Sequence, residues 1–188
     1  MISGNRLMRA LVSCVLAATT CAVFAATASA GKTNTFNGDC TNVPVQVTFA
    51  HPLTFTLELN TFEAIANGGT CSGTLNGQQI DGVPLYADFT PTGLQNCAGS
   101  DVVGPFHAIV DGKSFDFPNT SEHRVGISSV IQGDADGSGS LLANTEANSP
   151  SADQFAAECT STGLTEAGVV ADHLVFSNAT SPAHAPKK

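Results

Sequence analysis

The sequence contains no tryptophan and a single tyrosine, Tyr86. Secreted β-proteins that bind polysaccharide usually stack sugars on flat aromatic rings, and this chain has almost none to offer. Its phenylalanines mostly alternate with polar residues, as Phe49, Phe55, Phe115 and Phe117 do, which predicts that they point into a core. The scarcity of Trp and Tyr therefore argues against a carbohydrate-binding module built on an aromatic platform.

Basic residues are also few. Lys and Arg number 7 against 16 Asp and Glu, which gives a formal net charge of −9. Because phosphate binding needs a basic surface, we expect no nucleic-acid partner. Charged residues make up only 12% of the chain, too few for a highly charged disordered protein. The length of 188 residues suits one domain with a substantial core.

The N-terminus has the pattern of a secretory signal peptide. Arg6 and Arg9 precede an uncharged run over residues 10–26, and Ala28-Ser29-Ala30 supplies a small-x-small cleavage site of the kind used in bacterial export. We expect cleavage after Ala30. Cleavage after Ala28 and an uncleaved membrane anchor are the alternatives.

The expected organisation is a signal peptide over 1–30, a single all-β domain over 31–180 and a disordered C-terminal tail over 181–188. Cleavage removes two arginines and no acidic residue, so the remaining 158 residues carry a net charge of −11. After cleavage we expect a secreted, extracellular monomer without membrane contact. Its partner, at the cell surface or in the medium, is not identified by the sequence.

Four cysteines remain after cleavage, and an even number in an exported domain favours disulfides. They are Cys40, Cys71, Cys97 and Cys159, and no C-x-x-C pair suggests a zinc site. Four cysteines allow three connectivities. We favour Cys40–Cys71 with Cys97–Cys159, the arrangement without nesting, although spacing alone does not choose among the three.

Alternation of apolar and polar residues predicts β-strands in most of the chain. Val43–Phe49 and Leu53–Leu59 are the clearest examples, each with a period of two. Pro44 lacks an N–H group, so its strand should begin there or lie at a sheet edge. The His51-Pro52 pair should separate the two strands.

Two dipeptides predict tight hairpin turns, because Asn, Asp and Gly tolerate positive φ. Asp111-Gly112 would place Val110 opposite Lys113, Ala108 opposite Phe115 and Phe106 opposite Phe117, and Asn76-Gly77 marks the second hairpin. Further strands are expected over 34–36, 85–89, 125–132, 140–143 and 169–176.

One short helix is expected near residues 151–160. Ser151 and Gln154 form a capping box, Phe155 and Cys159 share one face, and Gly163 would end the helix. With eight or nine strands, the expected fold is an antiparallel β-sandwich of immunoglobulin-like or jelly-roll-like character. A closed antiparallel β-barrel is the alternative.

A Gly/Asp-rich segment resembles an EF-hand or dockerin calcium loop. Asp134, Asp136, Ser138 and Ser140 stand at alternating positions from which oxygen atoms can converge on Ca²⁺. The twelfth loop position should be a bidentate Glu, but it is Thr145 here, and no second helix is expected. The competing interpretation is a polar turn between two strands. Calcium is the only cofactor that the sequence suggests.

The histidines have no metal-ligand spacing. They are His51, His107, His123, His173 and His184. The predicted hairpin register places His107 opposite Asp116, which suggests a cross-strand surface pair rather than a catalytic or metal site.

No nucleophile elbow or zinc-protease motif is present, so no catalytic residue is predicted. We therefore favour a secreted, disulfide-stabilised, non-enzymatic binding module of unknown ligand. One alternative is a secreted enzyme or metalloprotein with a site assembled from distant His and Asp residues. Another is a β-barrel that carries a small apolar ligand inside.

Overall fold

The computed structural model describes residues 33–134 and 139–182, which lie in one compact unit, Gly31–Lys188. The described residues form nine β-strands and one α-helix. In chain order they are β1 (Thr33–Leu53), β2 (Glu58–Leu75), β3 (Gln78–Phe89), β4 (Thr92–Asn96), β5 (Gly99–Val110), β6 (Lys113–Val125), β7 (Ser128–Asp134), β8 (Ser140–Ser149), α1 (Ala152–Thr160) and β9 (Leu164–Pro182).

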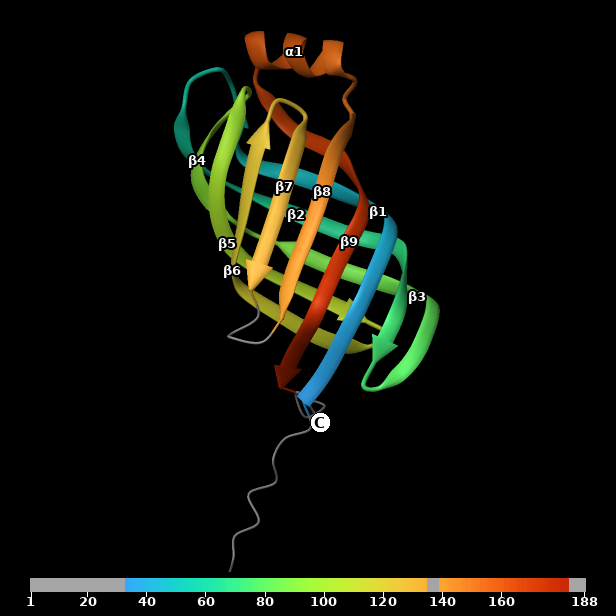
Figure 1. Ribbon diagram of the computed structural model, residues 1–188. Helices are drawn as coiled ribbons and strands as arrows, with labels where there is room; N and C mark the ends of the chain where they lie inside the picture. The colour runs from blue at the N-terminus through green and yellow to red at the C-terminus, as the bar shows by residue number, and fades with distance from the viewer. Residues whose placement is uncertain (1–32, 135–138, 183–188) are drawn as a thin grey trace, which may run out of the picture. The chain divides into compact units, whose positions relative to one another are not determined.

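All strand pairs are antiparallel and belong to one sheet, with the order β1-β9-β8-β7-β6-β5-β3-β2-β4. The sheet also closes on itself, because β1 pairs with β2 and β4 pairs with both β2 and β5. Figure 1 shows the strands wrapping around a common interior, with α1 across one end above β7 and β8. The predicted all-β, antiparallel class is confirmed, and β9 reaches two residues beyond the expected domain end at residue 180.

Both predicted hairpin turns are confirmed. Asp111 and Gly112 have φ values of 47° and 71°, and the β5–β6 register pairs Val110 with Lys113 and Phe106 with Phe117. Asn76-Gly77 likewise joins β2 to β3. These positive φ values fit a two-residue type I′ turn, which matches the twist of the flanking strands.

The interior of the closed sheet is filled largely by phenylalanine. Eight rings form a continuous series of contacts with centroid separations between 5.2 and 6.4 Å. Phe176 has the most neighbours, since it contacts Phe36, Phe115 and Phe117. Tilted and edge-on ring pairs of this kind stabilise a core beyond the area that they bury.

The expectation for Pro44 is wrong. β1 continues through this residue, which is paired with Val170 of β9 and lies far from either end of the strand. On the side that faces β2, the residues of β1 between Thr41 and Val45 have no paired partner. Because no ladder bond is needed at that gap, the missing N–H of Pro44 is tolerated within the strand.

The predicted strand over Leu53–Leu59 is also wrong. β1 runs past His51-Pro52 to Leu53, and β2 begins only at Glu58. Phe55 lies in the connection between them and is 54% exposed, so it does not serve the core. Likewise, the expected strand over 125–132 is divided by a turn at Gly126, whose φ is 60°.

The helix forms as expected. The backbone N–H of Ser151 donates to Oε1 of Gln154 over 3.1 Å, and the buried face carries Phe155 and Cys159. Gly163 has a φ of 81° and donates its N–H to the carbonyl of Glu158, which closes the C-terminal end. No helix among the described residues is long and apolar enough to cross a membrane.

Candidate functional site

A row of polar residues crosses the inside of the sheet near the end covered by α1. The register aligns Gln95, Ser100, Arg124, Ser129 and Thr145 on the five neighbouring strands β4 to β8. We call these five residues the polar row. Four of them are buried and Arg124 is half-buried. A buried polar row in an otherwise apolar core is costly unless its groups find partners, so its position needs a reason.

Glu122 extends the polar row toward the centre of the sheet. Its side chain is only 5% exposed, and its Oε2 accepts a hydrogen bond of 2.7 Å from the Ser100 hydroxyl. Burial raises the pKa of Glu122, an effect partly opposed by the Ser100 hydrogen bond and by the positive charge of Arg124. The site therefore holds a carboxyl group that takes up a proton more readily than one in water.

Arg124 is fixed at the rim of the same site. Its guanidinium donates to the backbone carbonyls of Gly126 and Asn96 over 2.9 and 2.7 Å. Burial lowers its pKa, and the nearby carboxylate of Glu122 raises it. The two opposite charges compensate each other inside the protein.

The polar row contains a pair of hydroxyl groups that bond to each other and an amide group without a partner. Ser129 and Thr145 form a hydroxyl pair across β7 and β8, with their oxygens 2.6 Å apart. Gln95 is 1% exposed, and among the described residues neither its amide oxygen nor its nitrogen has a hydrogen-bond partner. Buried amide groups in native proteins rarely lack partners.

A void of about 80 Å³ lies against the polar row. Glu122, Arg124, Ser129 and Thr145 line one side. Apolar residues of β1, β2, β3 and β9 line the other, among them Val47, Phe49, Phe62, Phe89, Leu164 and Val169. Ile131 and Ala147, from β7 and β8, stand among these polar groups, so the void is mostly apolar with four polar side chains on one side. A few polar groups in an apolar lining are the usual arrangement of a site that orients a small, mostly apolar molecule.

A second void of about 40 Å³, which we call the deeper void, lies farther from α1, which contributes no residue to its lining. It shares Val45, Ala64, Phe89, Ile131 and Thr145 with the first, so the two spaces are neighbours. Most of its other lining residues are small or aliphatic. Together the voids place polar groups near the α1 end and apolar groups farther in.

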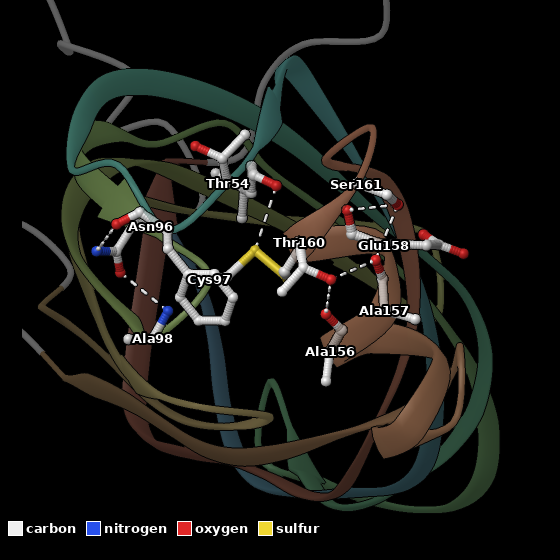
Figure 2. Close-up of a disulfide and its surroundings, with 12 residues drawn as sticks. Thr54, Asn96, Cys97, Ala98, Ala156, Ala157, Glu158, Thr160 and Ser161 are labelled. Carbon is white, nitrogen blue, oxygen red and sulfur yellow. Dashed lines mark hydrogen bonds between the residues drawn. A yellow bond between two sulfur atoms is a disulfide. The ribbon is translucent and has the colours of Figure 1, made fainter.

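The helix α1 covers the polar end of the interior. Phe155 lines the larger void, and Cys159, one turn later on the same helix face, is joined to Cys97 by a disulfide. Figure 2 shows this disulfide between the helix and the segment that contains Asn96 and Ala98. The backbone N–H of Cys97 also donates to the Thr54 carbonyl over 2.7 Å. This hydrogen bond links the β4–β5 connection, to which α1 is joined by the disulfide, to the β1–β2 connection.

Both disulfides join the cysteines that the sequence favoured. Cys40 and Cys71 are directly opposite each other on β1 and β2, and Cys97 pairs with Cys159. Of the four residues of the predicted calcium loop, the structure describes two. Asp134 and Ser140 are cross-strand partners at the end of the β7–β8 hairpin, whereas Asp136 and Ser138 lie outside the described residues, so the calcium prediction stays a prediction.

Three histidines form cross-strand pairs on the outer surface. His107 contacts Asp116, His123 contacts Asp101 and His173 contacts Asp39, each through Nδ1 at 2.6 Å. Exposed pairs of this kind add little to stability. Within residues 33–134 and 139–182, no group of three or more His, Cys, Asp or Glu side chains is placed to hold a metal ion. His184 lies outside those residues.

Sequence reasoning missed the polar row and Glu122. Thr120, Glu122 and Arg124 alternate regularly, but nothing nearby shows that this alternation faces inward. Only the strand register reveals that the inward positions change from odd to even between Phe117 and Thr120. Comparison with protein-family models, with curated proteins and with solved structures found no match.

The raised pKa of Glu122 predicts a specific pH dependence of stability. The folded protein keeps this proton at pH values where the unfolded chain, with a pKa near 4.5, has lost it. The free energy of unfolding should therefore fall as pH rises from about 4.5 through the folded pKa, and Glu122→Gln should remove that fall. Urea unfolding between pH 4 and 8 measures it.

The control for this prediction is Glu146→Gln, at an exposed position on β8. This variant should follow the wild-type pH profile. A constant stability difference between wild type and Glu122→Gln across the pH range would show that Glu122 titrates in the folded state as it does in water.

Proposed function

We propose that the protein is a secreted, non-enzymatic binding module that holds a small, mostly apolar molecule inside its closed sheet. The observation that carries this proposal is the mostly apolar void with four polar side chains on one side. A core built only for stability would gain by replacing the polar row with apolar residues, because buried polar groups must recover their lost hydration. The polar row is understandable if it recognises a ligand.

The remainder of the molecule supports this use. The interior is closed by strand pairing, covered by α1 and fixed by two disulfides, features that suit a carrier working outside the cell. The net negative charge gives no help in binding nucleic acid or anionic membranes. We propose that it works as a monomer, since the ligand site lies within one chain.

A thermal-melting experiment on the chain lacking residues 1–30 tests the proposal. The probes are five six-carbon molecules: 1-hexanol, 3,3-dimethyl-1-butanol, cyclohexanol, hexanoate and hexylammonium. A ligand that binds only the folded state raises stability by about 2.7 kcal/mol at a concentration one hundred times its Kd. We expect at least one probe to raise the melting temperature by several degrees.

Ala64→Leu should abolish that rise, because Ala64 lines both voids and the larger side chain fills them. Ala50→Leu makes the same chemical change at an exposed position of β1 and should leave the rise intact. The proposal is refuted if no probe raises the melting temperature, or if the folded Ala64→Leu protein responds as the wild type does.

A further inference from the structure

The two voids also indicate what kind of molecule is held. Resting on the proposed function, we infer that the ligand is an uncharged, unbranched amphiphile with a single hydroxyl or carbonyl head group. Its head would lie by Glu122 and the hydroxyls of Ser129 and Thr145, and its tail would extend into the deeper void.

The head group should be uncharged because the site is already balanced. Glu122 and Arg124 carry opposite charges, and Arg124 uses its guanidinium on two backbone carbonyls. A third charge in this buried place would have no partner, and an unpaired buried charge is strongly unfavourable. A hydroxyl or carbonyl, in contrast, can use the donors and acceptors of the Ser129–Thr145 pair.

The tail should be unbranched because the deeper void offers a volume of only about 40 Å³. Five alanines line it, from β2, β3, β8 and β9: Ala64, Ala66, Ala87, Ala143 and Ala171. Around them stand larger side chains, including Phe89, Phe106 and Leu174, which are already packed in the core. Short side chains between long ones leave room for a methylene chain. Because protein interiors are close-packed, the surrounding side chains do not move aside readily for a bulkier group.

The length follows from the volumes. A water-sized sphere takes about 10–15 Å³, so the larger void of about 80 Å³ holds on the order of six such spheres. The smaller void of about 40 Å³ holds on the order of three. An apolar cavity of about 150 Å³ holds benzene, which has six non-hydrogen atoms, so the two voids together match a straight chain with on the order of five to seven non-hydrogen atoms.

Calorimetric titration of the chain lacking residues 1–30, with the probes named above, tests the inference. We expect 1-hexanol to bind at least about tenfold more tightly than hexanoate, hexylammonium or the branched isomer 3,3-dimethyl-1-butanol, a difference of about 1.4 kcal/mol. The inference fails if an ion or the branched isomer binds as tightly, and the proposed function then survives. If none of the probes binds, the proposed function fails as well.

Variants separate recognition of the tail from a general loss of structure. Ala143→Val narrows the deeper void and should weaken 1-hexanol binding about tenfold while leaving 1-propanol, which does not reach it, within about twofold. Ala50→Val on the outer surface is the control and should change neither. Equal weakening of both alcohols by Ala143→Val would contradict the assignment of the tail to this void.

Discussion

Replacing Cys97 and Cys159 together with serine is expected to lower the free energy of unfolding by about 4 kcal/mol. The disulfide joins residues 62 positions apart, and a cross-link that closes so long a loop strongly restricts the unfolded chain. The same disulfide attaches α1 covalently to the connection between β4 and β5. A helix of nine residues has little stability of its own, so its position depends on this bond and on Phe155.

The same variant should release ligand faster, because a less firmly held α1 leaves the polar end of the interior open. Cys40→Ser with Cys71→Ser is the matched control. Its loop of 31 residues predicts a similar loss of stability, but its bond lies within the β1–β2 ladder and away from the cover. Urea unfolding and ligand exchange measured by NMR test both variants. Equal exchange rates in the two would contradict the role of α1 as a cover.

Phe176→Ala is expected to cost about 3–5 kcal/mol of stability, the range for removing a large aromatic side chain from a packed core. Phe176 is 1% exposed and contacts Phe36, Phe115 and Phe117, so the cavity left behind would lie at the centre of the ring series. Tyr86→Ala removes a ring that is 38% exposed and should cost much less. Urea unfolding measures both. A loss below about 1 kcal/mol for Phe176→Ala would show that the ring series does not stabilise the fold.

The fold was predictable from the sequence where local chemistry decides the conformation. Asp111-Gly112 accepts positive φ at both residues, so the dipeptide fixed the turn and with it the register of the β5–β6 hairpin. The capping residues Ser151 and Gln154 located α1 in the same way. The disulfide pairing followed only as a preference, because distances between strands are set by the complete sheet.

The candidate site was not predictable, for a physical reason that particular residues show. Between β5 and β6 the register advances by two residues from Gly104 to Phe106 but by three from Thr120 to Phe117. This bulge turns Glu122 and Arg124 inward, whereas the alternation that starts at Phe115 would place them outside. Phe55 shows the reverse error, since its alternation with Thr54 and Thr56 suggests a half-buried strand although it lies in an exposed connection.

Intermolecular NOE measurement between 1-hexanol and the protein tests the central claim most directly, because it locates the ligand. The account predicts contacts from the terminal methyl of 1-hexanol to the methyl groups of Ala143 and Ala171, which line the deeper void. Contacts confined to exposed apolar residues such as Leu94 and Val125, which are 52% and 67% exposed, would place the alcohol on the outer surface and contradict the claim.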